Sequence, residues 1–386
     1  MVQSIRPFFS LMLTVVLFML GAGYFVSFQS LVLKTNGYSE IIVGIVQSAY
    51  YGGLLLGSIK VEPFIHRVRH AKALAIFTTI SAISIMVQSL IPLPFFWVLL
   101  RFLGGFCLGG VYVVVESWLL EKSNEMNRGQ ILSIYLVTLY VSQACGQFLI
   151  NFVDIQSLQP YIAAGLLCIS SVIPILLSKA ELPHFSQPVV KKISTVFKES
   201  PFGFMGCIIS GMILSALYSF VPNFAQDVGL SPAYLMSITI FGGVLLQWPI
   251  GKLSDVFERK KLLIVISLIG LVPCVLMLFI PQVAFLTYVF SFILGGLTFT
   301  LYPISLTLAC EGINSNSLTS MTAVLLLAYG IGAVIGPLIA PLFMFEPFGI
   351  SGLYIFVAFM TLSLSFIGFV GNKDPGINEI SMTEEA

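Results

Sequence analysis

The sequence predicts an all-α membrane protein with twelve transmembrane helices in two six-helix bundles. Three observations predict it: an extremely apolar composition, apolar runs of helix-spanning length, and basic residues gathered on alternate loops. Of 386 residues, 58% are hydrophobic and 9% charged, with a mean hydropathy of +1.01. Such a chain cannot cover itself with a water-compatible surface, which excludes a soluble multidomain enzyme. The net charge of +1 gives no pull toward nucleic acid.

Apolar stretches recur along the whole chain with short polar breaks between them. A helix that crosses a bilayer needs about 20 mostly apolar residues. A transmembrane barrel would alternate apolar and polar residues, and Leu262 to Ile280 does not alternate. Helices are the remaining spanning structure. The predicted spans are 8–33, 39–59, 73–92, 94–120, 130–151, 158–178, 202–225, 231–250, 262–280, 283–310, 318–344 and 351–370.

The first span follows Arg6 and resembles a secretory signal at its start. Its apolar run continues to Leu33 and eleven more spans follow, so we interpret it as an uncleaved membrane helix.

Basic residues predict the orientation of the spans. The odd-numbered loops contain a single basic residue, Lys34. Arg101 lies inside a predicted span. Cytoplasmic loops carry the excess of Lys and Arg, so both termini are expected in the cytoplasm and the protein in the cell inner membrane. The termini and even-numbered loops hold Arg6, Lys60, Arg67, Arg69, Lys72, Lys122, Arg128, Lys179, Lys191, Lys192, Lys198, Lys252, Arg259, Lys260, Lys261 and Lys373.

Cysteine and histidine positions predict neither a metal site nor a cofactor. The six cysteines fall in or at the ends of spans without C-x-x-C spacing, which is typical of small packing residues. The three histidines, His66, His70 and His184, fall in predicted cytoplasmic loops.

A long polar connection divides the spans into six and six, which indicates a duplicated architecture. The predicted parts are an N-terminal bundle (1–178), a cytoplasmic linker (179–200), a C-terminal bundle (201–371) and a cytoplasmic tail (372–386). A shift of 190 residues aligns Gly52-Gly53 with Gly242-Gly243, Arg69 with Arg259, Gly105 with Gly295, Glu121 with Glu311 and Gly146 with Gly336.

The segment from Gly251 to Lys261, GKLSDVFERKK, is expected in the loop between spans 8 and 9. It resembles the loop signature of the major facilitator superfamily of secondary transporters, although Glu258 stands where that family usually has Gly. The resemblance implies close helix approach at the Gly and a charge cluster that latches the cytoplasmic side against a helix end of the other half. The gate residues it implies, with their repeat partners, are Gly251, Asp255, Arg259, Lys260, Glu311, Arg69 and Glu121.

Further segments extend the resemblance to the YcaD-like branch of bacterial inner-membrane facilitators. They include Arg101 to Gly105, Glu116 to Leu119, Leu245 to Gly251 and Tyr329 to Pro337. This branch brings no defined substrate with it.

Span 4 carries two charges on one helix face, because Arg101, Gly105, Leu108, Tyr112 and Glu116 are spaced by three or four. The charges lie about 22 Å apart along the axis, so they cannot pair. Charges inside spans normally face a wet cavity or a partner. Arg101 is expected to bind an anion or serve coupling, or to form a structural pair near the outer leaflet; Glu116 is expected to carry a proton or to pair with Arg128.

In the family that the chain resembles, spans 1, 4, 7 and 10 line the central cavity. The resemblance therefore implies that Tyr24, Gln29, Tyr112, Tyr218 and Tyr302 contact the solute beside Arg101.

We expect a secondary active transporter that moves a small solute by alternating access, and we expect the transport to be coupled to protons. The expected partners are the solute, protons and membrane lipid, without nucleic acid, and the expected state is a monomer. Two alternatives stay open: an ion-independent facilitator, and a membrane receptor or scaffold on the transporter fold. An intramembrane enzyme is disfavoured because the predicted spans contain neither His nor a central Asp.

Overall fold

The structure, a computed structural model, describes residues 8–123, 127–176, 193–280, 283–313 and 315–370, and these ranges form helices and turns without strands. Within them, twelve segments are long and apolar enough to cross a membrane, which confirms the predicted number. They are Phe9–Thr35, Glu40–Lys60, His70–Leu90, Pro94–Leu120, Gly129–Phe152, Gln159–Leu176, Pro201–Asp227, Pro232–Val256, Arg259–Phe279, Ala284–Ala309, Ser320–Phe343 and Gly349–Val370.

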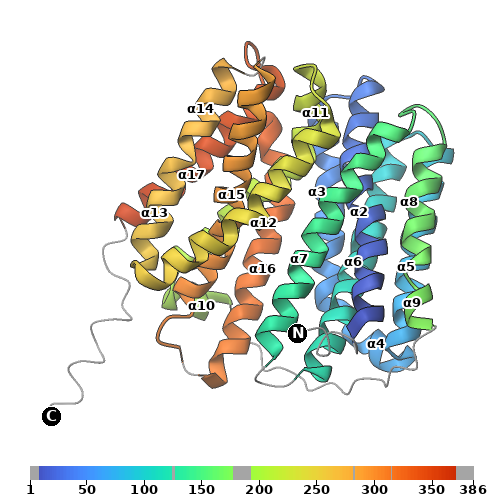
Figure 1. Ribbon diagram of the computed structural model, residues 1–386, viewed down its shortest axis with the longest axis horizontal. Coiled ribbons are helices and arrows are strands. Elements are labelled where there is room, and N and C mark those ends of the chain that lie inside the picture. The colour runs from blue at the N-terminus through green and yellow to red at the C-terminus, as the bar shows by residue number, and fades with distance from the viewer. Residues whose placement is uncertain (1–7, 124–126, 177–192, 281–282, 314, 371–386) are drawn as a thin grey trace. The chain divides into compact units, whose positions relative to one another are not determined.

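The first half of the chain contains α2 (Phe9–Thr35), α3 (Glu40–Lys60), α4 (Glu62–Val68), α5 (His70–Leu90), α6 (Pro94–Lys122), α7 (Arg128–Gln147), α8 (Gln159–Ser170) and α9 (Ile173–Leu176) (Figure 1). The second half contains α10 (Ile193–Glu199), α11 (Pro201–Asp227), α12 (Pro232–Val256), α13 (Arg259–Ile269), α14 (Leu271–Phe279), α15 (Ala284–Ala309), α16 (Ser315–Ile339) and α17 (Gly352–Val370). Short 3₁₀ turns extend α7 and α16 and precede α17: η2 (Phe148–Phe152), η3 (Ala340–Phe343) and η4 (Gly349–Ser351).

The chain forms two compact units. The first comprises the described residues of 1–186 together with Tyr218–Phe241, and the second those of 187–217 together with 242–386. The end of α11 and the start of α12 therefore belong to the same unit as α2 to α9. The predicted division at the linker 179–200 stays a prediction, because residues 177–192 and the tail from 371 lie outside the described residues.

Glycines bring α3 and α6 of the first unit into backbone contact. A Cβ at Gly53 would overlap the carbonyl oxygen of Phe102, and one at Gly105 would overlap that of Tyr50. Small residues of this kind allow helices to pack closely in lipid, where van der Waals contact supplies much of the association energy.

The second unit repeats this packing 190 residues later. A Cβ at Gly242 of α12 would overlap the carbonyl oxygen of Phe292 on α15. Phe292 is the repeat partner of Phe102, and Gly242 that of Gly52, next to Gly53. The sequence repeat therefore preserves a helix–helix contact in both units.

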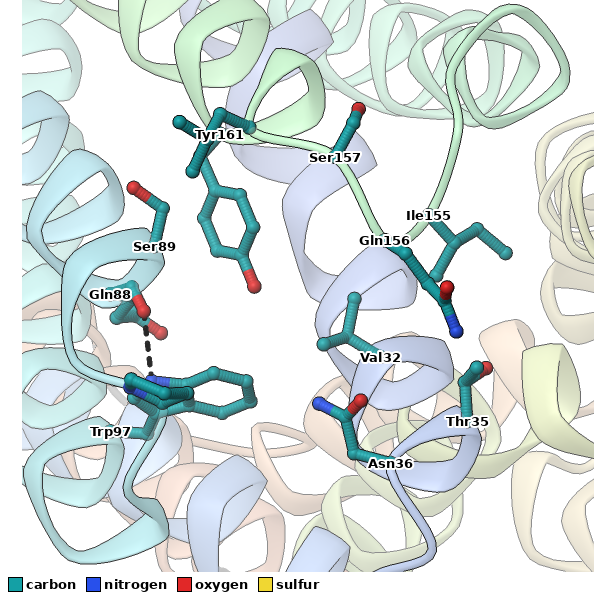
Figure 2. A pocket seen from close by; sticks show the side chains of 12 residues that line it. Val32, Thr35, Asn36, Gln88, Ser89, Trp97, Ile155, Gln156, Ser157 and Tyr161 are labelled. Atoms are coloured by element: carbon teal, nitrogen blue, oxygen red, sulfur yellow. Dashed lines mark hydrogen bonds between the residues drawn. The ribbon is translucent and has the colours of Figure 1, made fainter.

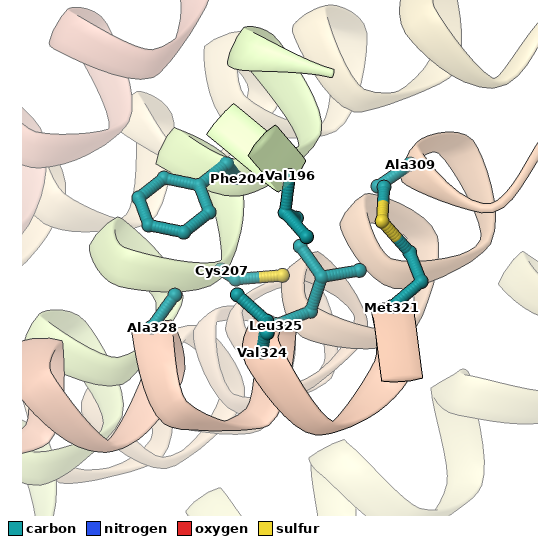
Figure 3. Close-up of a cluster of buried hydrophobic side chains, with 8 residues drawn as sticks. All are labelled: Val196, Phe204, Cys207, Ala309, Met321, Val324, Leu325 and Ala328. Carbon is teal, nitrogen blue, oxygen red and sulfur yellow. The ribbon is translucent and has the colours of Figure 1, made fainter. Parts of the chain in front are cut away.

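Apolar side chains of the second unit anchor the short helix α10. Val196 of α10 is fully buried, and Figure 3 shows it among side chains from α11, α15 and α16. The remaining members of this cluster are Phe204, Cys207, Ala309, Met321, Val324, Leu325 and Ala328. The contacts hold α10 against the start of α11 and against α16.

Two predicted loops are helical. Gly251 and Asp255 lie within α12, which continues to Val256, and Arg259 begins α13, so only Phe257 and Glu258 connect the two helices. His70, expected in a loop, begins α5 and is 3% exposed. Both corrections have one reason: hydropathy marks where apolar residues stop, whereas a helix continues until its backbone is interrupted.

Candidate functional site

Arg101 of α6 points into the interior of the first unit. Its side chain is 3% exposed and donates a hydrogen bond of 2.8 Å to Gln47 Oε1 on α3. The guanidinium carbon lies 4.2 Å from the ring centre of Tyr50 and 5.5 Å from that of Phe25. A cavity of about 20 Å³ adjoins it, far smaller than a metabolite. Its role in solute binding stays a prediction.

Glu116 lies near the C-terminal end of α6, away from Arg101, and is half-buried. Its Oε1 accepts a hydrogen bond of 3.2 Å from the hydroxyl of Tyr135 on α7. One turn away on α6, the Tyr112 hydroxyl lies 3.7 Å from Met19 Sδ on α2. The Arg128 side chain lies outside the described residues, so the predicted alternative of a pair with Glu116 stays open.

Tyr24 and Gln29 of α2 are buried inside the first unit. Tyr24 is 0% exposed and stacks on Phe28 with ring centres 5.6 Å apart. Gln29 is 1% exposed and donates a hydrogen bond of 2.6 Å to Gln88 on α5. In this structure the two side chains pack between helices, and solute contact by them stays a prediction.

The two remaining tyrosines lie in different units. In the first unit, the Tyr218 hydroxyl donates a hydrogen bond of 3.1 Å to Gln143 Oε1 on α7. In the second, the ring of Tyr302 lies 4.8 Å from that of Tyr329 on α16. Each tyrosine thus joins neighbouring helices of its own unit.

A polar network that the sequence did not predict joins α2 and α3 to the end of α11, and all of it lies in the first unit. Lys34 Nζ lies 2.5 Å from Asp227 Oδ2, donates to the carbonyl oxygen of Asn223 at 2.9 Å, and lies 4.0 Å from Glu40 Oε1. Asn223 Nδ2 in turn donates to Glu40 Oε2 at 3.1 Å. Ser30 Oγ lies 3.0 Å from Asn223 Oδ1 and also bonds the carbonyl oxygen of Ser219. We call Ser30, Lys34, Glu40, Asn223 and Asp227 the Lys34 network.

One feature of the sequence indicated that Lys34 has a special role. It is the single basic residue of the predicted odd-numbered loops, and an isolated cation beside the ends of spans is expected to pair with an acid. Its acidic partner Asp227 follows 193 residues later, so sequence spacing alone could not identify the pair.

The predicted gate residues are brought together only in part. Arg259 Nη1 lies 2.5 Å from Glu311 Oε1 at the end of α15, so this pair forms within the second unit. Asp255 is exposed, and Lys260 is half-buried on the first turn of α13. In the first unit, Arg69 is exposed between α4 and α5 with φ +72, whereas the Glu121 side chain lies outside the described residues. Contact with the other half stays a prediction.

Gly251 departs from the close helix approach that the motif implied. Apart from its chain neighbours and the backbone of its own helix, no heavy atom of the described residues lies within 4 Å of the position that a Cβ would occupy there. The neighbouring Lys252 instead places its ammonium 3.9 Å from the ring centre of Trp248 on the same helix.

A cavity of about 260 Å³ lies in the first unit near the Lys34 end of α2. Figure 2 shows the Trp97 indole on one side and the Tyr161 ring on another, with Gln88 and Ser89 beside them. Trp97 Nε1 donates to the carbonyl oxygen of Gln88 at 3.0 Å. The lining is completed by Val32, Thr35, Asn36, Pro92, Ile155, Gln156, Ser157 and Leu158, so the cavity is polar but uncharged.

The chain is similar to known proteins in both sequence and structure. The sequence profile of the Major Facilitator Superfamily matches residues 11–242 and 233–385. The uncharacterized MFS-type transporter YcaD of Escherichia coli is 30% identical over 369 residues, covering 94% of each chain.

Among solved structures, the nucleoside transporter NupG is similar with a TM-score of 0.75 and 16% identity, over 94% of this chain and 98% of NupG. A D-xylose–proton symporter is similar with a TM-score of 0.73 and 14% identity, over 94% of this chain and 97% of the symporter. At these identities the structures establish the fold alone. Twelve apolar helices, the repeated helix contact and the family profile agree: the chain belongs to the major facilitator superfamily and is a multi-pass membrane transporter of a small solute.

Proposed function

We propose that the protein moves its solute by alternating access and that the Lys34 network closes one end of the path. The observation that carries this proposal is the small number of polar contacts that join α2 and α3 to α11. Partly exposed ion pairs contribute about 0 to 1 kcal/mol each. The hydrogen bonds of the buried Ser30 and Asn223 contribute about 1 kcal/mol each, so a closure made of these few contacts can open at modest cost. The side chains of Lys34 and Asp227 are 18% and 47% exposed.

Glu116 is the residue that we propose to carry a proton. It is an acid inside a membrane span, and among the described residues no ion pair includes it. Its partner is the neutral hydroxyl of Tyr135. Ionisable groups within membrane segments are costly and frequently mark proton or ion pathways. The Tyr135 hydroxyl can hydrogen-bond the Glu116 carboxyl in both of its protonation states.

The expected setting is the cell inner membrane with both termini in the cytoplasm, as the basic loops indicate. We expect a monomer that carries the solute without converting it chemically. NupG and the D-xylose–proton symporter suggest the first solutes to test, namely nucleosides and pentoses.

The experiment is a proton-flux assay in proteoliposomes that contain a pH-sensitive dye. Addition of the transported solute should acidify the lumen with the wild-type protein, because a symporter brings protons in with its solute. Glu116→Gln should abolish the acidification, since the amide cannot release a proton at any accessible pH. Glu62→Gln, an acid on the short helix α4, serves as the matched control and should behave as wild type.

Other outcomes separate the alternatives. Acidification that persists in Glu116→Gln would remove Glu116 as the proton carrier. Solute uptake by the wild type without any change of lumen pH would identify an ion-independent facilitator. Solute binding without uptake would favour a receptor on the transporter fold.

A further inference from the structure

Arg101 is a buried cation without an acidic partner. Its side chain is 3% exposed, and none of the ion pairs among the described residues includes it. Gln47 accepts one hydrogen bond from Nη2, while Nε has no hydrogen-bond partner in the described part of the chain. A buried charge is strongly unfavourable unless it is paired and its donors are satisfied.

The aromatic neighbours of Arg101 reduce this cost without neutralising the charge. The guanidinium lies over the ring of Tyr50 at 4.2 Å and faces Phe25 at 5.5 Å. Cation–π contacts are attractive but leave the net charge of the site at one. Arginine also stays protonated in proteins, so it cannot escape the cost by losing its proton. Among the described residues, no acidic side chain balances the charge of Arg101.

A small cavity lies beside this guanidinium. It measures about 20 Å³ and is lined by Arg101 together with Ser81, Ser84 and Gln88 of α5. Apolar side chains of α2 and α6, such as Phe18 and Leu108, complete the lining. A space of this size holds about one water-sized particle. The Arg101 guanidinium and the Ser81 hydroxyl can supply hydrogen-bond donors to it, whereas the Ser84 hydroxyl already donates to the carbonyl oxygen of Ile80 at 2.8 Å.

We propose that this cavity binds one halide-sized anion, chloride, as the counter-ion of Arg101. Charge selects an anion, because the cavity adjoins an unpaired cation and no carboxylate lines it. Size excludes sulfate, phosphate and carboxylate metabolites. The chloride binds between α2, α5 and α6 of the first unit and stabilises their packing. The proposal is independent of how the solute is transported.

Thermal unfolding of the purified protein in different sodium salts tests the proposal. Chloride and bromide should raise the unfolding midpoint above that in gluconate at equal ionic strength, and the increase should saturate with concentration. At a hundred-fold excess over Kd, the anion multiplies the folded-to-unfolded ratio by about 100. Sulfate stabilises folded proteins in general by exclusion from their surface, so any increase in sulfate should not saturate and should be the same in the Arg101→Met variant. Equal midpoints in chloride, bromide and gluconate would overturn the proposal and leave water as the occupant.

Three variants localise the effect. Arg101→Met removes the charge, and Ser81→Val fills the cavity but keeps Arg101; in both, the difference between chloride and gluconate should vanish. Arg67→Gln removes an exposed arginine of α4 and should keep the difference. A difference that survives in Ser81→Val and in Arg101→Met would reveal a general salt effect and contradict the site. If Arg101→Met does not fold, crystals of the wild type grown in bromide provide a second test. An anomalous signal beside Arg101 would support the site, and its absence, together with an unchanged salt effect in Ser81→Val, would contradict it.

Discussion

At Gly105 the absence of a side chain determines how closely two helices approach. The α-carbon of this residue faces the carbonyl oxygen of Tyr50. At its neighbour Gly104, no heavy atom of the described residues lies within 4 Å of a possible Cβ, apart from the chain neighbours and the backbone of the same helix. Two adjacent glycines of one helix therefore have opposite roles. The sequence alone shows both as equivalent members of a small-residue motif.

We predict that Gly105→Ala lowers the thermal unfolding midpoint and the yield of folded protein. The added methyl group has to displace backbone, and overpacking of this kind costs about 1 to 3 kcal/mol. Gly104→Ala is the matched control and should be neutral or slightly stabilising, because Ala favours the helix by about 1 kcal/mol over Gly. Similar midpoints for the two variants would show that α3 and α6 are not in backbone contact here.

At the scale of elements, the Lys34 network connects three helices through side chains that lie far apart in the sequence. Ser30 and Asn223 are separated by 193 residues and Lys34 and Asn223 by 189. These contacts are polar, unlike the glycine contacts between α3 and α6: the Lys34 ion pairs are partly exposed, while Ser30 and Asn223 are buried. The first kind of contact can open and re-form, while the second holds a bundle together.

We predict that Lys34→Gln exposes the residues one turn below the network. Ser27 is 0% exposed and lies three residues before Ser30 on α2, so Ser27→Cys should react slowly with maleimide in the closed network. Loss of about 1 kcal/mol of pairing should raise its labelling rate about five-fold. The assay uses a background in which the accessible Cys145 and Cys310 are replaced by Ser. Lys261→Gln, which breaks an exposed pair with Glu258, should leave the rate unchanged.

Unchanged labelling in Lys34→Gln would mean that apolar packing, and not the Lys34 network, keeps this end closed. A charge exchange, Lys34→Asp with Asp227→Lys, should restore slow labelling if the ion pair is responsible. Failure of the exchange to restore it, after Lys34→Gln had raised the rate, would assign the effect to the hydrogen bond with Asn223.

At the scale of the whole molecule, charge distribution and repeat agree with the family. Basic residues gather on alternate loops. The carbonyl of Phe292, the repeat partner of Phe102, again meets a glycine, one residue earlier in the repeat register. These are global regularities that no single residue carries. They explain why the fold class and the number of spans were predictable from the sequence.

We predict that the loop of Lys34 faces outward and the helix end at Lys252 faces the cytoplasm. In intact cells, a membrane-impermeant maleimide should label Asn36→Cys but not Lys252→Cys, in the same cysteine-reduced background. Both positions are exposed, so accessibility alone cannot explain a difference. Permeabilised cells, in which both variants should react, provide the control. Labelling of Lys252→Cys alone in intact cells would reverse the proposed orientation.

The sequence by itself determined the twelve spans and the family, because hydropathy, loop charge and motif spacing are properties of consecutive residues. The tertiary structure alone decided that Arg101 turns toward Gln47 and Tyr50, that Gly251 adjoins open space, and that Lys34 meets Asp227. The physical reason is helix rotation. In a span that is apolar on nearly every side, sequence periodicity does not indicate which face meets which neighbour, and packing against distant segments sets that choice.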